Sequence, residues 1–444
     1  MPFSAVLCRS LPFSAVLCRS LPYSVALCRT LSLRIDFSAL LPRPVRLVHL
    51  SDLHLGFRQF QRVTPAGKNQ READVAQSFT RAIDKVIALA PDLVLIGGDV
   101  FHTVRPTNPA ILHAFQQFSR LRAALPNAIV VIVAGNHDMP RSSETTCILR
   151  LFEPLGFHIA DVTTRRLQFP EHELSILAVP DLPPGSVDLS PDLAFKHNVL
   201  LLHGEVEGAL PEGAREDERA SMPIPASAVS HERWDYVALG HYHVYRKVGP
   251  NAYYCGSLDY TSTNSWGEYA EEKAAKLPGK GLIERDLATG KQAFHALPVT
   301  RKIIDLPPIA GRGLSAVDLD AAIAATVEKC PDGGIEGKVV RLVVRDVPRH
   351  VVRELDHQRL REFQRRALHF ALDTRRPTVV RTAVAESGAP GRRPSLADTL
   401  REALRSRVLT SDIDRDRLVA LGEHYLREAE HDMAVRGVDE PETA

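Results

Sequence analysis

Short apolar runs alternate with amphipathic stretches along the chain from Val45 onward. The runs that predict strands are Val45–His49, Leu93–Ile96, Ala128–Val133, Ser175–Val179, Val199–Leu202 and Tyr236–Leu239. Between them, apolar side chains recur at helical spacing, first at Val75, Phe79, Ile83, Val86, Ile87 and Ala90 and then at Leu112, Phe115 and Phe118. The second helix has Thr107 as its expected cap and Pro109 in its first turn. Strands that alternate with helices predict an α/β domain with a largely buried sheet over 45–298.

The pattern restarts near residue 299 and predicts a second, smaller α/β domain over 299–385. Its expected strands are Arg301–Leu306, Lys338–Val344 and Thr378–Val384, and its expected helices are Ser315–Glu328 and Val352–Leu372. Polar stretches rich in proline and glycine at 182–192, 207–226 and 262–281 predict surface loops.

The two ends of the chain have a different character. Residues 2–10 read PFSAVLCRS and residues 12–20 repeat them, while arginines interrupt the apolar stretches, so we expect 1–44 to be a disordered or spurious leader without a targeting role. Residues 386–394 have the composition of a linker. We expect a helical segment over 395–432 and a disordered tail over 433–444.

Composition excludes several classes of protein. Of the 444 residues, 44% are hydrophobic and 25% are charged, which is typical of a globular protein. No apolar run approaches the roughly 18 residues of a membrane span, so no membrane contact is expected. The six cysteines include no CxxC pair, which argues against a disulfide framework or zinc ribbon and favours the cytoplasm. A net charge of +1 neither supports nor excludes binding to a polyanion.

Five short polar motifs each follow an expected strand. They are Asp52-Leu53-His54, Gly98-Asp99, Gly135-Asn136-His137-Asp138, His203-Gly204 and Gly240-His241-Tyr242-His243. The carboxyl ends of strands are where open α/β sheets gather ligands. Imidazole, carboxylate and amide oxygen together suit two divalent ions such as Mn, Fe or Zn. Two carboxylates leave positive charge on such a pair of ions, so the site would attract a phosphate and lower the pKa of a bound water.

The order of these motifs resembles that of calcineurin-like metallophosphoesterases. GGDVFH at 97–102, the second domain and the terminal helices are similar to the SbcD-type DNA-repair exonucleases, the nuclease half of the SbcC–SbcD break-repair complex. The resemblance is strong over 45–300, extends to 300–385 only in layout, and has no counterpart in the leader. It implies a metallophosphoesterase β-sandwich flanked by helices, with a small α/β capping domain and C-terminal helices.

The resemblance also implies roles for individual residues. Asp52, His54, Asp99 and His243 would hold one ion, and Asp99 would bridge to a second ion held by Asn136, His203 and His241. His137 would lie over the scissile phosphate as proton donor or transition-state stabiliser, supported by His102 and Asp138. Simple hydrogen bonding within the loops is the alternative for His102 and Asp138. We expect two divalent ions, Mn²⁺ first, with Fe or Zn as alternatives.

Local charge and apolar stripes suggest partners. Between Lys338 and Arg376, eleven Lys and Arg face five acidic residues, an excess that suits a DNA backbone or, alternatively, a solvated helix face. Leu396, Leu400 and Leu404 form one stripe, and Leu418, Leu421 and Tyr425 form another. In the resembled family this region grips an SbcC-like coiled-coil ATPase; packing on the chain's own domain is the alternative. The resemblance alone implies a homodimer through the helices at 73–90 and 110–124.

The interpretation favoured by the sequence is a metal-dependent DNA nuclease that acts in double-strand-break repair, in the cytoplasm at the nucleoid. A small-molecule phosphodiesterase or phosphatase would share the metal site without needing the basic domain or the terminal helices. A non-catalytic scaffold is disfavoured, because all seven expected ligand positions and His137 are present.

Overall fold

The computed structural model describes residues 45–140, 146–182, 188–210, 223–230, 232–377, 395–407 and 414–436. The expected leader, the strand at 378–384 and the linker at 386–394 lie outside these ranges. The chain divides into two compact units, one up to Pro377 and the other from Thr378 onward. Each unit is described by itself.

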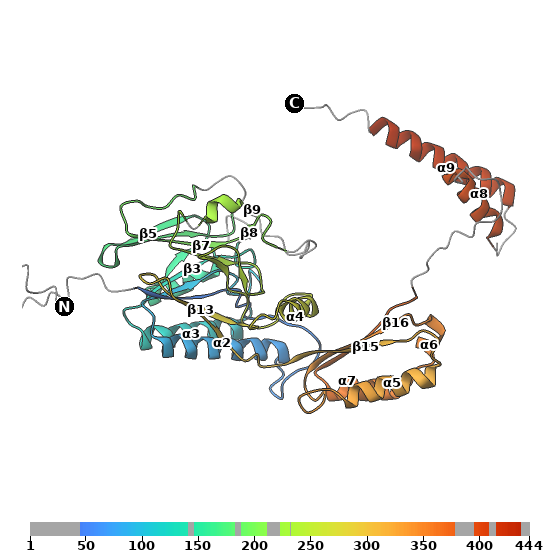
Figure 1. Cartoon of the computed structure of the whole chain (residues 1–444), viewed down its shortest axis with the longest axis horizontal. Helices are drawn as coiled ribbons and strands as arrows, with labels where there is room; N and C mark the ends of the chain where they lie inside the picture. The colour runs from blue at the N-terminus through green and yellow to red at the C-terminus, as the bar shows by residue number, and fades with distance from the viewer. Residues whose placement is uncertain are drawn as a thin grey trace, which may run out of the picture. The chain divides into compact units, whose positions relative to one another are not determined.

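Two six-stranded sheets form the body of the first unit (Figure 1). The first sheet has the order β14 (Gln292–Ala296), β13 (Gly281–Asp286), β1 (Arg46–Leu50), β2 (Leu93–Ile96), β3 (Ile129–Val133) and β4 (His158–Ala160). The second has the order β11 (Arg246–Lys247), β12 (Ala252–Tyr254), β10 (Tyr236–Gly240), β7 (His197–His203), β6 (Leu174–Val179) and β5 (Arg165–Phe169). All six strands expected from the apolar runs are present, and the central strands of both sheets run parallel.

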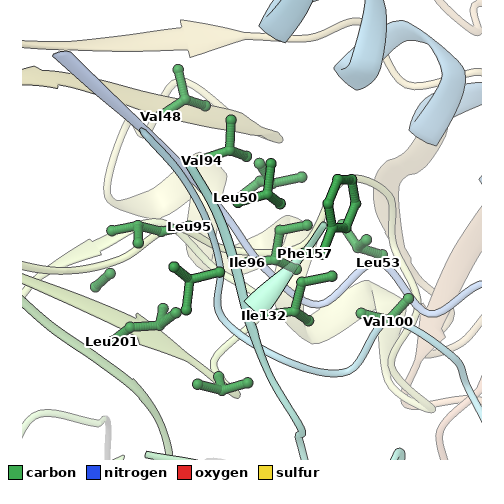
Figure 2. Packing of buried hydrophobic residues seen from close by; sticks show 14 of the residues in the cluster. Val48, Leu50, Leu53, Val94, Leu95, Ile96, Val100, Ile132, Phe157 and Leu201 are labelled. Atoms are coloured by element: carbon green, nitrogen blue, oxygen red, sulfur yellow. The ribbon is translucent and has the colours of Figure 1, made fainter. Parts of the chain in front are cut away.

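The two sheets share one apolar core, so they form a sandwich. Leu50, Ile96 and Ile132 of the first sheet and Leu201 of the second are buried in the same cluster (Figure 2). This arrangement confirms the expected α/β fold class with a helix-flanked β-sandwich. The parallel central strands bring their carboxyl ends to one edge, which is where the polar motifs lie.

Helices α2 (Gln70–Leu89) and α3 (Asn108–Ala124) lie side by side against the first sheet (Figure 1). The Asn69 side chain starts α2 by accepting hydrogen bonds from the first-turn amides, and Thr107 caps α3 as expected. Of the stripe predicted for α2, Val75, Phe79, Ile83 and Val86 are buried and Ile87 is partly buried, whereas Ala90 caps the end of the helix and is exposed. The stripe predicted for α3 is wrong in part: Leu112 is 61% exposed and Phe115 is 37% exposed, because α3 turns its small residues and Phe118 toward the core.

The segment expected as a surface loop at 262–281 contains a helix, α4 (Ser265–Ala274). Asn264 caps it by accepting from the Gly267 amide. The helix brings Glu268 and Glu272 into the interior, where Lys280 pairs with both carboxylates. Shorter elements complete the first domain: β8 (Glu205–Val206) pairs with β9 (Pro223–Ile224), and 3-10 helices span Ile148–Leu155, Pro170–His172 and Ala226–Val229.

The small domain is a three-stranded parallel sheet covered by helices (Figure 1). Its elements are β15 (Ile303–Ala310), α5 (Ala316–Glu328), β16 (Val339–Arg345), α6 (Arg349–Arg353), α7 (His357–Arg366) and β17 (His369–Thr374). The single helix expected over Val352–Leu372 is therefore wrong. Asp356 breaks it, because its side chain accepts from the amides of Gln358 and Arg359 and starts a new helix. The third strand then follows at once as β17.

The described residues of the second unit form α8 (Leu396–Ser406) and α9 (Arg415–Arg436). Helix α9 is longer than expected and continues past the predicted start of a disordered tail at 433. Leu400 and Leu404 of α8 lie against Gly422 of α9, so two stripe residues pack within the pair. No helix in the described parts of the chain is long and apolar enough to cross a membrane.

Candidate metal centre

The structure gathers all seven expected ligands at the carboxyl edge of the two sheets. Asp52 and His54 follow β1, Asp99 follows β2, Asn136 follows β3, His203 ends β7, and His241 and His243 follow β10. The register of the strands explains why these seven residues lie close together. Leu50, the last residue of β1, pairs with Ile96, and His203 pairs with Gly240, so the loops leave the sheets at the same level.

Two imidazoles and two carboxylates make up the first half of the centre. The Nε2 atoms of His54 and His243 lie 2.9 Å apart. Asp99 Oδ2 is 3.6 Å from His54 Nε2, and Asp52 Oδ1 is 3.9 Å from His243 Nε2. Asp52, His54 and His243 thus form a group with the spacing of metal ligands.

The second half shares Asp99. The Oδ2 atom of Asp99 is 3.7 Å from His203 Nε2, nearly the same distance as from His54. Asn136 Oδ1 lies 3.0 Å from His203 Nε2, and the ring of His241 lies edge-on to that of His203 with centroids 5.4 Å apart. The Asp99 carboxylate therefore lies between the donor set that contains His54 and the donor set that contains His203.

The ring nitrogens of His54 and His243 indicate that a cation fits between them. His243 Nδ1 lies 3.4 Å from the Glu268 carboxylate, which can only accept a hydrogen bond, so this nitrogen carries the proton. The Nε2 atom of His243 then presents a lone pair toward His54 Nε2. With nitrogen, carboxylate and amide donors and no thiolate, the set suits Mn, Fe or Zn.

Backbone strain is concentrated in the same loops. Four non-glycine ligands have positive φ angles: Asp52 at 52°, His54 at 44°, Asp99 at 50° and His241 at 102°. Such conformations are uncommon for these residue types and cluster at functional sites. The loops after β1 and β2 hold one another in place, because the amides of Asp52 and His54 donate to the carbonyls of Gly98 and Asp99.

Two glycines permit this close packing of loops. A Cβ atom on Gly135 would lie 2.1 Å from Asp99 Oδ1, and one on Gly240 would lie 1.7 Å from the carbonyl oxygen of Gly97. These two glycines therefore leave room for the candidate ligand Asp99 and for the neighbouring loop that carries Gly97.

Burial dominates the electrostatics of the centre. It lowers the pKa of His54 well below its ordinary value, and the neighbouring His243 lowers it further. Burial also raises the pKa of Asp99. At His203 burial acts to lower the pKa, but the charges of Asp99 and Asp52 outweigh it and raise the pKa. The buried carboxylates of Asp52 and Asp99 need compensating positive charge, which divalent cations would supply, and neutral imidazoles could then bind those cations.

His137 and His102 lie together beside the first set of donors. His137 Nδ1 lies 2.8 Å from the carbonyl oxygen of His102 and donates to it, which leaves His137 Nε2 available. The two rings stack with centroids 5.2 Å apart, and His137 is partly exposed. His102 Nδ1 is 3.2 Å from His54 Nδ1, and burial lowers the pKa of His102 to about 4, so it is neutral at pH 7.

Asp138 is fully enclosed by backbone donors. Its carboxylate accepts hydrogen bonds from the amides of Val100 and Phe101, each at 3.0 Å, and from that of Gly135 at 3.2 Å. Burial and the nearby Asp99 raise its pKa to about 7. Asp138 therefore ties the loop after β2 to the loop after β3, which is the loop hydrogen bonding considered as the alternative from sequence.

Sequence reasoning missed Glu268. This buried carboxylate lies against His243 Nδ1, accepts from the Ser262 amide, and pairs with buried Lys280. No motif marks it, because it lies 25 positions after His243 in a stretch that was expected to be a loop. The only signal was the spacing of Glu268 and Glu272, one helical turn apart.

Comparison with known families agrees with the geometry. A family model described as calcineurin-like phosphoesterase matches residues 45–255. Residues 45–255 form a calcineurin-like phosphoesterase domain. The matched span contains all seven candidate ligands of this phosphoesterase domain together with His137.

The chain is also similar to archaeal proteins named DNA double-strand break repair protein Mre11. It is 28% identical to that of Methanococcus maripaludis over 260 residues, which cover 55% of this chain and 63% of the relative. It is 43% identical to that of Methanocaldococcus jannaschii over 94 residues, or 21% and 24% of the two chains. It is 29% identical to that of Sulfolobus acidocaldarius over 211 residues, which cover 46% of this chain and 50% of the relative. The chain thus spans less than two thirds of the length of each of these relatives.

Proposed function

We propose that the protein is a metal-dependent nuclease that hydrolyses DNA phosphodiester bonds in double-strand-break repair, in the cytoplasm at the nucleoid. The observation that carries the proposal is Asp99, whose Oδ2 atom lies 3.6 Å from His54 and 3.7 Å from His203 and so can bridge two cations. The match to the phosphoesterase family supports the reaction class, and the similarity to relatives named DNA double-strand break repair protein Mre11 supports DNA as the substrate.

We assign one cation to Asp52, His54, Asp99 and His243 and the second to Asp99, Asn136, His203 and His241. Two divalent cations would supply the positive charge that draws in a phosphate diester and lowers the pKa of water. We propose Mn²⁺ as the metal, with Fe or Zn as alternatives that the same donors accept.

His137 has the position of a proton donor in this scheme. Its Nδ1–H donates to the His102 carbonyl, which fixes the ring and turns Nε2 outward. Partial exposure allows Nε2 to reach a leaving oxygen. His102 acts as a positioning residue through His54, and Asp138 acts as one through the two loops that it joins.

The small domain offers cations for a DNA backbone. Of the eleven basic residues from 338 to 376, Lys338, Arg341, Arg366 and Arg375 are bound by carbonyls or acids of the domain itself. The remaining seven make no ion pair with any residue that the structure describes. Three of these, Arg349, Arg353 and Arg376, line one cavity of about 270 Å³, which suits a phosphate. None of the candidate metal ligands lines this cavity, so a substrate that contacts both places would carry more than one phosphate, as DNA does.

We propose that the terminal helices bind an SbcC-like coiled-coil ATPase. Leu400 and Leu404 are used within the helix pair, but Leu396, Leu421 and Tyr425 remain 65%, 50% and 61% exposed. Exposed large apolar side chains on neighbouring helices are typical of a protein interface.

We also propose that the protein forms a homodimer through α3. Leu112 and Phe115 are exposed on this helix although the core uses its opposite side. Replacing both, Leu112→Glu with Phe115→Glu, should give a monomer in sedimentation equilibrium, whereas the matched double change Val162→Glu with Leu193→Glu, at exposed apolar positions outside α3, should not. A dimer that persists in the double variant would contradict this interface.

The nuclease proposal is tested by assaying the purified protein on linear duplex DNA and on an aryl phosphodiester, with Mn²⁺, Mg²⁺ or a chelator. We expect Mn²⁺-dependent cleavage of both substrates and none with chelator. Turnover of the aryl diester without DNA cleavage would favour a small-molecule phosphodiesterase instead. No turnover of either substrate would contradict the enzyme assignment.

A further inference from the structure

A cavity of about 920 Å³ opens between the phosphoesterase domain and the small domain. One wall is the loop that begins directly after His54 and carries Phe60 to Arg62, and the other is α7 together with the start of β17. Its volume lies in the range of ligand pockets. It is separate from the metal centre, because none of the candidate ligands lines it.

The lining of this cavity combines positive charge with aromatic rings. Arg62, Arg361 and Arg365 contribute guanidinium groups, three glutamines contribute amides, and no Asp or Glu is among the lining residues. Arg361 and Arg365 are exposed and form no ion pair within the described ranges of the chain. Two guanidinium groups that form no ion pair with any described residue favour an anionic ligand.

The aromatic part of the cavity lining includes a residue with a strained backbone conformation. Phe60 stacks on His369 with ring centroids 3.9 Å apart and an interplanar angle of 13°, and both rings are partly exposed. Phe60 has a φ of 60°, an uncommon conformation for so large a residue. The Asn69 side chain donates to the Phe60 carbonyl at 2.9 Å and so holds the turn that presents the ring.

Arg62 fixes the two walls to each other. Its guanidinium donates to the carbonyl oxygens of Arg365 at 2.6 Å and Ala367 at 3.0 Å, at the carboxyl end of α7. Arg62 is therefore occupied as a structural clamp. Arg361 and Arg365 remain as the groups that can bind a ligand.

We propose that this cavity binds an unpaired nucleotide of single-stranded DNA, with the base against the Phe60–His369 stack and the phosphates on Arg361 and Arg365. In a duplex the base faces are covered by stacking, so an aromatic surface can take a base only from a single strand. Burial lowers the pKa of His369, so the stack is neutral and the charge comes from the arginines alone. The inference rests on the nuclease function and gives that site a preference for substrates with a single-stranded end.

The test measures binding of a fluorescent ten-residue oligothymidine and of a blunt duplex by anisotropy, in chelator, with the full-length protein. Arg361→Ala with Arg365→Ala should weaken single-strand binding by about tenfold or more and lower the salt slope by about 1.4, since each phosphate contact contributes roughly 0.7. Lys291→Ala with Arg312→Ala removes the same formal charge elsewhere and should change binding less than the pocket pair.

The ring is tested separately. Phe60→Asn keeps a residue type that accepts the left-handed backbone and should weaken single-strand binding by about tenfold while leaving duplex binding unchanged. Phe60→Tyr keeps the ring and should bind like the wild type, and thermal unfolding confirms that each variant is folded. Equal losses for single strand and duplex, or no loss in Phe60→Asn, would overturn the proposal. Mn²⁺-dependent turnover of an aryl phosphodiester by the wild type tests the metal centre alone, so failure of the nuclease function is distinguishable.

Discussion

At the scale of single residues, a neighbouring group holds the Nδ1 atom of several histidines in the centre and so orients their rings. His203 Nδ1 lies 2.7 Å from the carbonyl of Gly97, His137 Nδ1 donates to the carbonyl of His102, and His243 Nδ1 faces Glu268. In His203 and His243 the Nε2 atom is thereby left without a proton and can bind a cation, whereas His137 must carry a second proton on Nε2 to act as the proton donor. Such outer partners set both the tautomer and the orientation of a metal-binding imidazole.

His137 should behave differently from the candidate ligands. Because its backbone amide is held by Asp99 and its Nδ1 by His102, the ring is positioned without help from an ion. His137→Ala should therefore keep two metal ions per chain and lose roughly 10²–10⁴ in rate, the usual scale for a general acid. Metal analysis that finds one ion missing would identify His137 as a ligand instead.

Glu268 should control metal affinity through His243. Glu268→Gln removes the charge that holds the Nδ1 proton, and we expect metal affinity to fall by about 10–100-fold. The single change also removes one of the two carboxylates that pair with Lys280. The double change Glu268→Gln with Lys280→Gln removes both charges of that pair, so it separates the effect on His243 from the effect of the broken ion pair. Glu153→Gln, at an exposed position away from the candidate ligands, is the matched control. Unchanged affinity in a folded Glu268→Gln protein would reduce Glu268 to a structural role.

At the scale of elements, α8 and α9 illustrate how an apolar stripe divides between internal packing and exposure. Gly422 lets α9 approach Leu400 and Leu404 closely, while Leu421 and Tyr425 point away from that contact and stay exposed. Leu421→Asp with Tyr425→Asp should therefore abolish binding to the proposed coiled-coil ATPase in a pull-down without unfolding the helix pair. Leu400→Ala, which weakens the internal contact, should lower the melting temperature instead. Full partner binding by the aspartate variant would show that the interface lies elsewhere.

The strands and the metal motifs could be predicted because their signals are local. Runs such as Leu93–Ile96 are apolar on both sides, and the residues after them share one edge in any parallel sheet. Three features depended on tertiary contacts and were missed. Asp356 divides the helix expected at Val352–Leu372, Glu268 is buried by α4, and Leu112 is exposed although its spacing resembles that of a core residue.

At the scale of the whole molecule, the two domains of the first unit are joined by a buried ion pair. Arg301, just before β15, donates to both oxygens of Asp74 on α2 at 2.9 Å and to the carbonyl of Gly337 at 2.6 Å. Asp74 also pairs with Arg71, which in turn pairs with Asp259. The position of the small domain is thus fixed to the helix layer of the phosphoesterase domain.

This junction should make stability depend on pH. Burial alone would raise the pKa of Asp74, but Arg301 and the other donors outweigh it and lower the pKa below 3.8. The stabilisation that the ionised Asp74 provides is therefore fully present above pH 3.8, the ordinary pKa of this carboxyl in the unfolded chain. It is lost as the pH falls through the lower pKa of the folded protein. Asp74→Asn should unfold at a lower temperature than the wild type at pH 7, and the gap should narrow below about pH 4. A gap that is the same at pH 7 and pH 3 would contradict this account.

The central claim is that Asp99 bridges two catalytic cations. The most direct measurement is the metal content of Asp99→Asn, determined by mass spectrometry on the folded protein with Mn²⁺ supplied, beside its rate on linear DNA. The amide keeps the size of the side chain but removes the charge that both ions would share. We predict the loss of at least one of two ions and a fall in rate of several orders of magnitude. A folded Asp99→Asn protein that keeps two ions and near wild-type turnover would contradict the two-metal account.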